Sequence, residues 1–122
     1  MKKLFLYKSA CGYWKPKESL DSNMELLWSF FADDSIKFLE YSLEFLQKNK
    51  DWESAGGDAI DLRRHDGQIT LSYEFEEDGP SFTIKESELE KILVGWLKLV
   101  KSGAKEIMIE SQDDEHYTIT GK

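Results

Sequence analysis

The stretch from Gln68 to Glu76 constrains the fold of this chain more than any other. Apolar and polar residues alternate strictly along it, with the apolar side chains at Ile69, Leu71, Tyr73 and Phe75. A period of two is typical of a β-strand with one face on a core and the other facing water or a partner. Turn signals stand on both sides, Asp66-Gly67 before the stretch and Asp78-Gly79-Pro80 after it. The stretch is therefore predicted to be a strand inside an antiparallel meander.

Five other segments have the character of strands: Lys3–Lys8, Ala59–His65, Ser81–Lys85, Lys105–Glu110 and Glu115–Thr120. In the first of them four apolar residues follow one another, which predicts a strand buried on both faces. The Asp66-Gly67 dipeptide predicts a tight hairpin between the second segment and the central strand.

Helical spacing dominates two regions of the chain. Between Asp21 and Lys50, apolar residues recur every three or four positions, and the pattern breaks near Ala32–Ser35. We prefer two helices there, with one long bent helix as the alternative. A further helix is expected from Ser87, which with Glu90 has the spacing of a capping box, to Gly103.

These elements predict an α+β fold with the order β-α-α-β-β-β-α-β-β. A single domain over residues 1–122 is expected, with a largely antiparallel sheet of about six strands and helices packed on one face. Cys11 is the only cysteine, so no intramolecular disulfide is possible, as suits a reducing cytoplasm. The apolar run near the N-terminus is too short for a signal peptide, and no stretch approaches a membrane span. A soluble, cytoplasmic protein is therefore predicted.

The net charge narrows the possible partners. Sixteen Lys and Arg stand against twenty-four Asp and Glu, so the net charge is −8 and the pI is near 4.8. Such a charge opposes nucleic acids and anionic membranes and speeds encounter with basic partners. It is equally compatible with selection for solubility alone.

Acidic residues gather at the predicted turns and on the outward face of the central strand. Together they can form a surface that imitates phosphate or fills a basic groove, or they can be solvated turns. Aromatic residues in loops are available as anchors for such an interface, although a lid over the core is the preferred interpretation for Tyr13 and Trp14. The predicted partner-binding residues are Glu74, Glu76, Glu77, Asp78, Asp113, Asp114, Trp14, Tyr13 and Trp52.

The sequence contains no recognisable catalytic motif. His65 and His116 can in principle act as general acid and base, but neither has a nucleophile or lysine at a diagnostic spacing. The run Asp113-Asp114-Glu115-His116 has metal-ligand residue types, yet consecutive strand residues point to opposite faces, so a solvated turn is favoured. No catalytic residue, metal ligand or cofactor is therefore predicted.

The chain resembles the immunity proteins that bacteria co-express with secreted toxins, in particular those of contact-dependent growth inhibition systems. The similar segments are Gly67-Gln68-Ile69-Thr70-Leu71-Ser72-Tyr73, Ile92-Leu93-Val94-Gly95-Trp96-Leu97 and Gly103-Ala104-Lys105-Glu106-Ile107. The resemblance implies a non-enzymatic protein that binds a basic toxin domain, often a nuclease. Binding would block the active site of that toxin or the access of its substrate.

Two other functions stay open. One is a regulatory or adaptor domain whose acidic loops or polar sheet face bind another protein. The other is a small hydrolase or nuclease that uses His65 and His116. The sequence also leaves open the strand order, the oligomeric state and which sheet edge is exposed to pair with a partner or a second copy.

Overall fold

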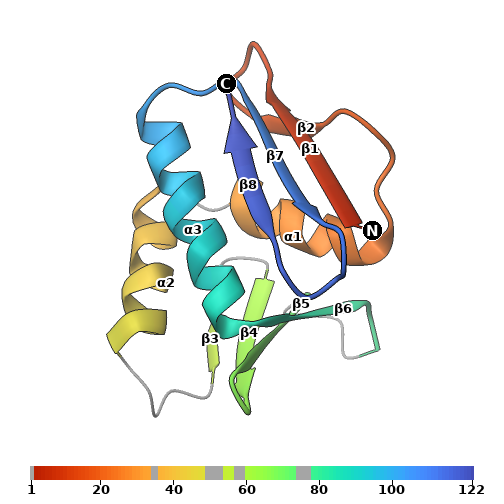
Figure 1. The fold of residues 1–122 in the computed structure, drawn as a ribbon, viewed down its shortest axis with the longest axis vertical. Helices are drawn as coiled ribbons and strands as arrows, with labels where there is room; N and C mark the ends of the chain where they lie inside the picture. The colour runs from red at the N-terminus through yellow and green to blue at the C-terminus, as the bar shows by residue number, and fades with distance from the viewer. Residues whose placement is uncertain (1, 34–35, 49–53, 57–59, 74–77) are drawn as a thin grey trace.

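The computed structural model describes residues 2–33, 36–48, 54–56, 60–73 and 78–122 (Figure 1). This part of the chain has three helices, α1 (Ser22–Asp33), α2 (Ile36–Lys48) and α3 (Glu86–Lys101). Its strands are β1 (Lys2–Lys8), β2 (Trp14–Pro16), β3 (Ser54–Gly56), β4 (Ile60–His65), β5 (Gln68–Tyr73), β6 (Ser81–Lys85), β7 (Glu106–Ser111) and β8 (Thr118–Gly121).

The strands form two antiparallel sheets of four strands each, ordered β2-β1-β7-β8 and β3-β4-β5-β6. The predicted α+β class is confirmed, whereas the expectation of one sheet of about six strands is wrong. The meander β4-β5-β6 forms as predicted, but α3 then carries the chain away from it. As a result β7 pairs with β1, and the chain segment after Lys8 returns as β2 on the other side of β1.

One core lies between the two sheets. Both α1 and α3 contact strands of the first and of the second sheet, and α1 runs behind the first sheet in the view of Figure 1. The largest fully buried side chains come from both sheets and from α1, α2 and α3, and they include Leu4, Leu6, Leu26, Leu27, Phe30, Phe31, Leu39, Leu62, Ile69, Phe82, Trp96 and Tyr117. Two small sheets and three helices thus stabilise one another through shared apolar area.

The prediction that the first strand is buried on both faces is wrong. Leu4 and Leu6 are fully buried, while Phe5 and Tyr7 are only half-buried. The helices pack on the side that carries Leu4 and Leu6, and the intervening residues of a strand point to the opposite face. A run of apolar residues therefore does not by itself establish two covered faces.

The first helical region forms two helices, as we prefer from the sequence, since α1 ends at Asp33 and α2 begins at Ile36. Helices α2 and α3 lie antiparallel. Gln47 donates to Glu90 at 3.0 Å near one end of the pair, and Lys101 lies 3.5 Å from Glu40 near the other.

The capping box predicted for α3 is absent. The helix begins at Glu86 with Lys85 as its N-cap, and no side chain caps it by a hydrogen bond. Because β6 leads directly into α3, Ser87 lies inside the first turn and cannot be the N-cap, while Glu90 bonds to Gln47 instead. The predicted end is confirmed, because Gly103 has a φ of 88° in the left-handed region that favours glycine.

Close contact between α3 and β8 depends on Gly95. A Cβ atom on Gly95 would lie 2.4 Å from Cγ2 of Ile119, a branched methyl group with little freedom to move. Alanine normally stabilises a helix interior by about 1 kcal/mol relative to glycine. Here the clash reverses the sign, and we expect Gly95→Ala to lower the free energy of unfolding by ~1–3 kcal/mol in urea titrations.

The matched control places the same substitution in an Ile119→Ala background. With the methyl group gone, Gly95→Ala is expected to be neutral or stabilising relative to Ile119→Ala alone. An equal loss of stability in both backgrounds would contradict the close approach of α3 to β8.

Candidate functional site

The loop between β7 and β8 is ordered by the side chain of Asp113. Its Oδ1 accepts hydrogen bonds from the backbone N–H groups of Glu115 at 2.9 Å and His116 at 2.8 Å. Its Oδ2 lies 2.7 Å from Nδ1 of His116. The hydrogen bonds from the His116 side chain, the His116 backbone and the Glu115 backbone hold the pKa of Asp113 well below its ordinary value. Asp113 therefore stays ionised and fixes the shape of the loop.

The same loop is fastened to α3 by Glu88. The backbone N–H of Tyr117 donates to Oε1 of Glu88 at 2.7 Å, and Nζ of Lys91 donates to the same atom at 2.7 Å. Burial of Glu88 would raise its pKa, but the hydrogen bonds from Lys91 and Tyr117 and the charge of Lys91 outweigh burial, so the pKa is lowered. The carboxylate is thus charged and satisfied at neutral pH.

Tyr117 also joins the loop to the second sheet. Its buried ring meets the ring of Phe82 in β6 edge-on, with centroids 6.3 Å apart. The ammonium group of Lys2 lies 5.1 Å from the centroid of the same Phe82 ring. The end of the first sheet that carries this loop is therefore packed onto β6.

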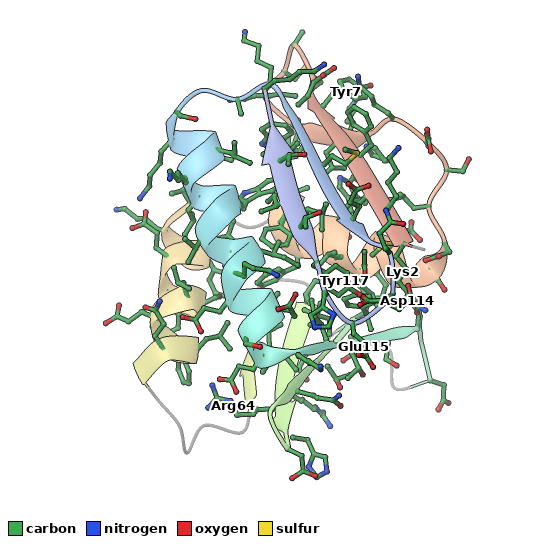
Figure 2. The ribbon with its side chains drawn as sticks, in the orientation of Figure 1. Lys2, Tyr7, Arg64, Asp114, Glu115 and Tyr117 are labelled. Atoms are coloured by element: carbon green, nitrogen blue, oxygen red, sulfur yellow. The ribbon has the colours of Figure 1, made fainter. Side chains whose placement is uncertain are left out.

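We group four acidic residues under the name acidic surface: Asp113, Asp114 and Glu115 of the β7–β8 loop, and Asp78 of the turn before β6, the strand on which that loop packs. All four are exposed, and Figure 2 labels Asp114 and Glu115 in the loop that also carries Tyr117. Asp78 lies in the turn that leads into β6. Asp114 has a φ of 64°, a conformation that aspartate tolerates better than most residues.

The other predicted site residues do not all gather here. Glu74, Glu76, Glu77 and Trp52 lie outside the described residues. Trp14 is only 7% exposed, and its ring packs against Trp96 with centroids 5.2 Å apart, so it stabilises the core and does not form a contact surface. Tyr13 is 65% exposed.

Tyr13 and the acidic surface lie at opposite ends of the first sheet. The register pairs Lys8 with Trp14 at one end of β1, whereas Lys2 pairs with Ser111 at the other. A hollow of about 240 Å³ is lined by Gly12 and Trp14, the chain neighbours of Tyr13, and by the aromatic side chains of Phe31 and Trp96. The predicted residues therefore form two separate places and not one continuous face.

Sequence reasoning missed the outer face of the first sheet. Phe5 and Met108 line a hollow of about 270 Å³ there. The ammonium group of Lys17 lies 4.4 Å from the Phe5 ring centroid and also pairs with Glu106. Lys3, Phe5 and Tyr7 share one face of β1, and the charge of Lys3 was the available signal that this face meets solvent. The run of four apolar residues after Lys3 concealed that signal.

The two histidines lie in different parts of the fold, since His65 ends β4 and His116 lies in the β7–β8 loop. His65 is exposed in the β4–β5 hairpin, with Nε2 at 3.2 Å from Asp66, and His116 pairs with Asp113. Neither ring lines the two hollows described above. Over the residues that the structure describes, no three His, Cys, Asp or Glu side chains are grouped to hold a metal ion.

None of the described helices is long and apolar enough to cross a membrane. Comparisons with protein-family models, curated proteins and solved structures found no match to this chain. Its function must therefore be inferred from its own geometry and charge.

The hydroxyl group of Tyr117 is buried and has no hydrogen-bond partner among the described residues. Removing an unsatisfied polar group costs nothing, so we expect Tyr117→Phe to keep or raise the free energy of unfolding, by up to ~1–2 kcal/mol. A loss of stability in urea titrations would show that the hydroxyl has a partner.

The hydroxyl group of Tyr117 is expected to ionise only at strongly alkaline pH. Burial, together with the charges of Asp114, Asp113 and Glu88, raises the pKa of Tyr117 from 10.0 to about 12. Its contribution to stability is therefore complete below pH 10 and is lost as the pH rises through the folded pKa. Ultraviolet titration should show one of the five tyrosines ionising near pH 12, and this step should be missing in Tyr117→Phe.

The contribution of Glu88 to stability is expected to be lost in acid, the opposite of the pH dependence of Tyr117. Because its pKa is lowered from 4.5, its contribution is complete above pH 4.5 and is lost as the pH falls through the lower folded value. Glu88→Ala leaves the Tyr117 N–H without its acceptor and should cost ~1–3 kcal/mol at neutral pH. Glu88→Gln keeps an acceptor, so it should cost less and should flatten the acid arm of the stability curve. Identical acid arms in the native protein and Glu88→Gln would contradict this role.

Proposed function

We propose that this chain is a non-enzymatic immunity-type protein that binds and neutralises a basic toxin domain, with a nuclease the best candidate. The observation that carries the proposal is the ordered acidic loop. Asp113 and Glu88 hold that loop in place, so Asp114 and Glu115 are presented to solvent in a fixed arrangement.

Order in the loop matters for binding. A partner that meets a preformed surface does not have to offset the entropy of ordering it. The carboxylate of Asp113 is occupied by bonds within the loop, so its role in binding is to position its neighbours. The exposed carboxylates of Asp78 and Glu115 are then the groups offered to a basic cleft.

The net charge supports the same partner. A nuclease presents positive charge to hold phosphate, and a protein with a net charge of −8 is steered towards such a cleft. The adaptor alternative shares the same charge signals and differs only in the identity of its partner. The hydrolase alternative would need His65 and His116 to act on one substrate, and the separate carboxylate partners of the two rings do not favour it.

The direct test is affinity purification of the tagged protein from its native host, followed by an activity assay of any co-purified chain. The proposal predicts a stoichiometric basic protein whose toxic activity is blocked in the complex and returns when the two are separated. A stoichiometric partner with no activity to inhibit would favour the adaptor. Hydrolysis by the isolated protein that is lost in a His65→Ala/His116→Ala double variant would favour the enzyme.

Charge reversal of the acidic surface tests its contribution. We expect Asp78→Lys with Glu115→Lys to slow association with that partner roughly tenfold at low salt and to weaken its salt dependence. Asp113 is left intact because it orders the loop, and Asp114 because its left-handed backbone disfavours lysine. Rates are measured by stopped-flow fluorescence.

A matched control carries the same change in charge elsewhere. Glu40→Lys with Glu44→Lys reverses two exposed carboxylates on α2, which lies on the other side of α3 from the acidic loop (Figure 1). Equal slowing by both double variants would mean that only net charge matters. That result would remove the acidic surface as the binding site.

A further inference from the structure

Strand β6 is one edge of the second sheet, because no other strand in the described part of the chain pairs with it besides β5. Each residue in an antiparallel ladder directs its N–H and C=O to one side only, and bonded and non-bonded pairs alternate along the strands. The positions of the bonded pairs between β5 and β6 therefore determine which backbone groups of β6 point outward.

Two observations fix this alternation. The β4–β5 hairpin turns through Asp66 and Gly67, both with positive φ, so the flanking pair His65 and Gln68 exchanges hydrogen bonds. Gln68 thus directs its backbone to β4, and its partner Lys85 receives no bond from it.

A backbone hydrogen bond at the start of α3 leads to the same assignment of bonded pairs. The N–H of Glu86 donates to the carbonyl of Gly67 at 2.9 Å, which makes that pair a bonded one. The next bonded pairs are then Ile69 with Ile84 and Leu71 with Phe82. The Thr70 and Thr83 hydroxyls lie 3.0 Å apart, as suits a non-bonded pair, whose side chains approach more closely.

It follows that Ser81, Thr83 and Lys85 direct their backbone N–H groups away from the sheet. Ser81 and Thr83 direct their C=O groups outward too, whereas the C=O of Lys85, as the helix N-cap, accepts the first bond of α3. The side chains of all three residues are exposed. An exposed edge of this kind is a template for another extended chain.

Charge distinguishes the possible occupants of this edge. Asp78 precedes β6, and Asp114 and Glu115 belong to the loop whose Tyr117 packs on Phe82 in β6. The basic residues described nearby are Lys2 and Lys85, together with Lys91, which is bound to Glu88, and Arg64, which pairs with Glu86. A second copy paired edge to edge would bring two acidic surfaces together on chains that each carry a net charge of −8. A basic extended segment would instead meet opposite charge.

We propose that β6 binds an extended, basic segment of the toxin-like partner as an additional strand, with the exposed carboxylates of Asp78 and Glu115 contacting its lysine and arginine side chains. Backbone hydrogen bonds to Ser81, Thr83 and Lys85 supply affinity, and the carboxylates select for positive charge. The proposal rests on the proposed function for the identity of its partner.

The test uses proline to remove outward N–H groups without removing any bond to β5. Lys85 suits this substitution because its φ of −60° is the value that proline adopts. Thr83→Pro with Lys85→Pro is compared with Thr83→Ala with Lys85→Ala, which loses the same side chains and charge but keeps both N–H groups. Lys85→Pro alone is the fallback variant should the double proline variant fail to fold.

The probe is a short synthetic peptide of alternating lysine and valine, with a glutamate–valine peptide and an N-methylated lysine–valine peptide as controls. In the free protein, NMR hydrogen exchange should be fast at Thr83 and Lys85 and slow at Phe82 and Ile84. The lysine–valine peptide should slow exchange at Thr83 and Lys85. Its affinity should fall roughly tenfold or more in the proline variant relative to the alanine variant, and the N-methylated peptide should not bind.

Several results would overturn the proposal. They are equal binding to the proline and alanine variants, equal binding of the glutamate peptide, or protection confined to other residues. A dimer of this chain that the proline variant abolishes would assign the edge to a second copy.

The two proposals fail in different ways. If a captured toxin is bound and inhibited equally by the proline and alanine variants, the proposed function stands and β6 is excluded. If the peptide pairs with β6 but no inhibited toxin is found, the edge stands as a binding site and the proposed function fails.

Discussion

The burial of one core between two separate sheets holds this molecule together. Helices α1 and α3 contact strands of both sheets, and α3 approaches β8 closely only because Gly95 leaves room for Ile119. The ring of Tyr117 on Phe82 then joins the end of the first sheet to β6. Since neither sheet covers its apolar face alone, the position of the β7–β8 loop is set by the core itself.

That dependence explains how a cluster of negative charges can be held in a fixed shape. Like charges repel, and exposed loops lose order easily. Here Asp113 accepts hydrogen bonds from within the loop, and Glu88 accepts bonds from Lys91 and Tyr117. The remaining carboxylates are thus presented at little additional cost, next to a strand edge whose backbone groups point outward. Charge and edge together define the surface to which we assign partner binding.

Local patterns predicted the local structure well. The alternation from Ile69 to Tyr73, the Asp66-Gly67 turn and the end of α3 at Gly103 all depend on neighbouring residues, and all three are confirmed. The pairing of β1 with β7 joins residues about a hundred positions apart, and no local pattern records it. For Trp14 the sequence favoured a lid over the core and also offered it as an interface anchor, and only its burial against the distant Trp96 decides for the core. The exposed edge could be assigned only once the strand order was known.

The most direct measurement is hydrogen exchange by NMR on the complex with the co-purified toxin-like partner, compared with the free protein. We expect new protection at the Thr83 and Lys85 amides in β6, whereas the Glu115 amide is already bonded to Asp113 in the free protein and should be protected in both states. Protection confined to the hollow lined by Gly12 and Trp14, or to the groove between α2 and α3 lined by Leu43 and Val94, would contradict this assignment.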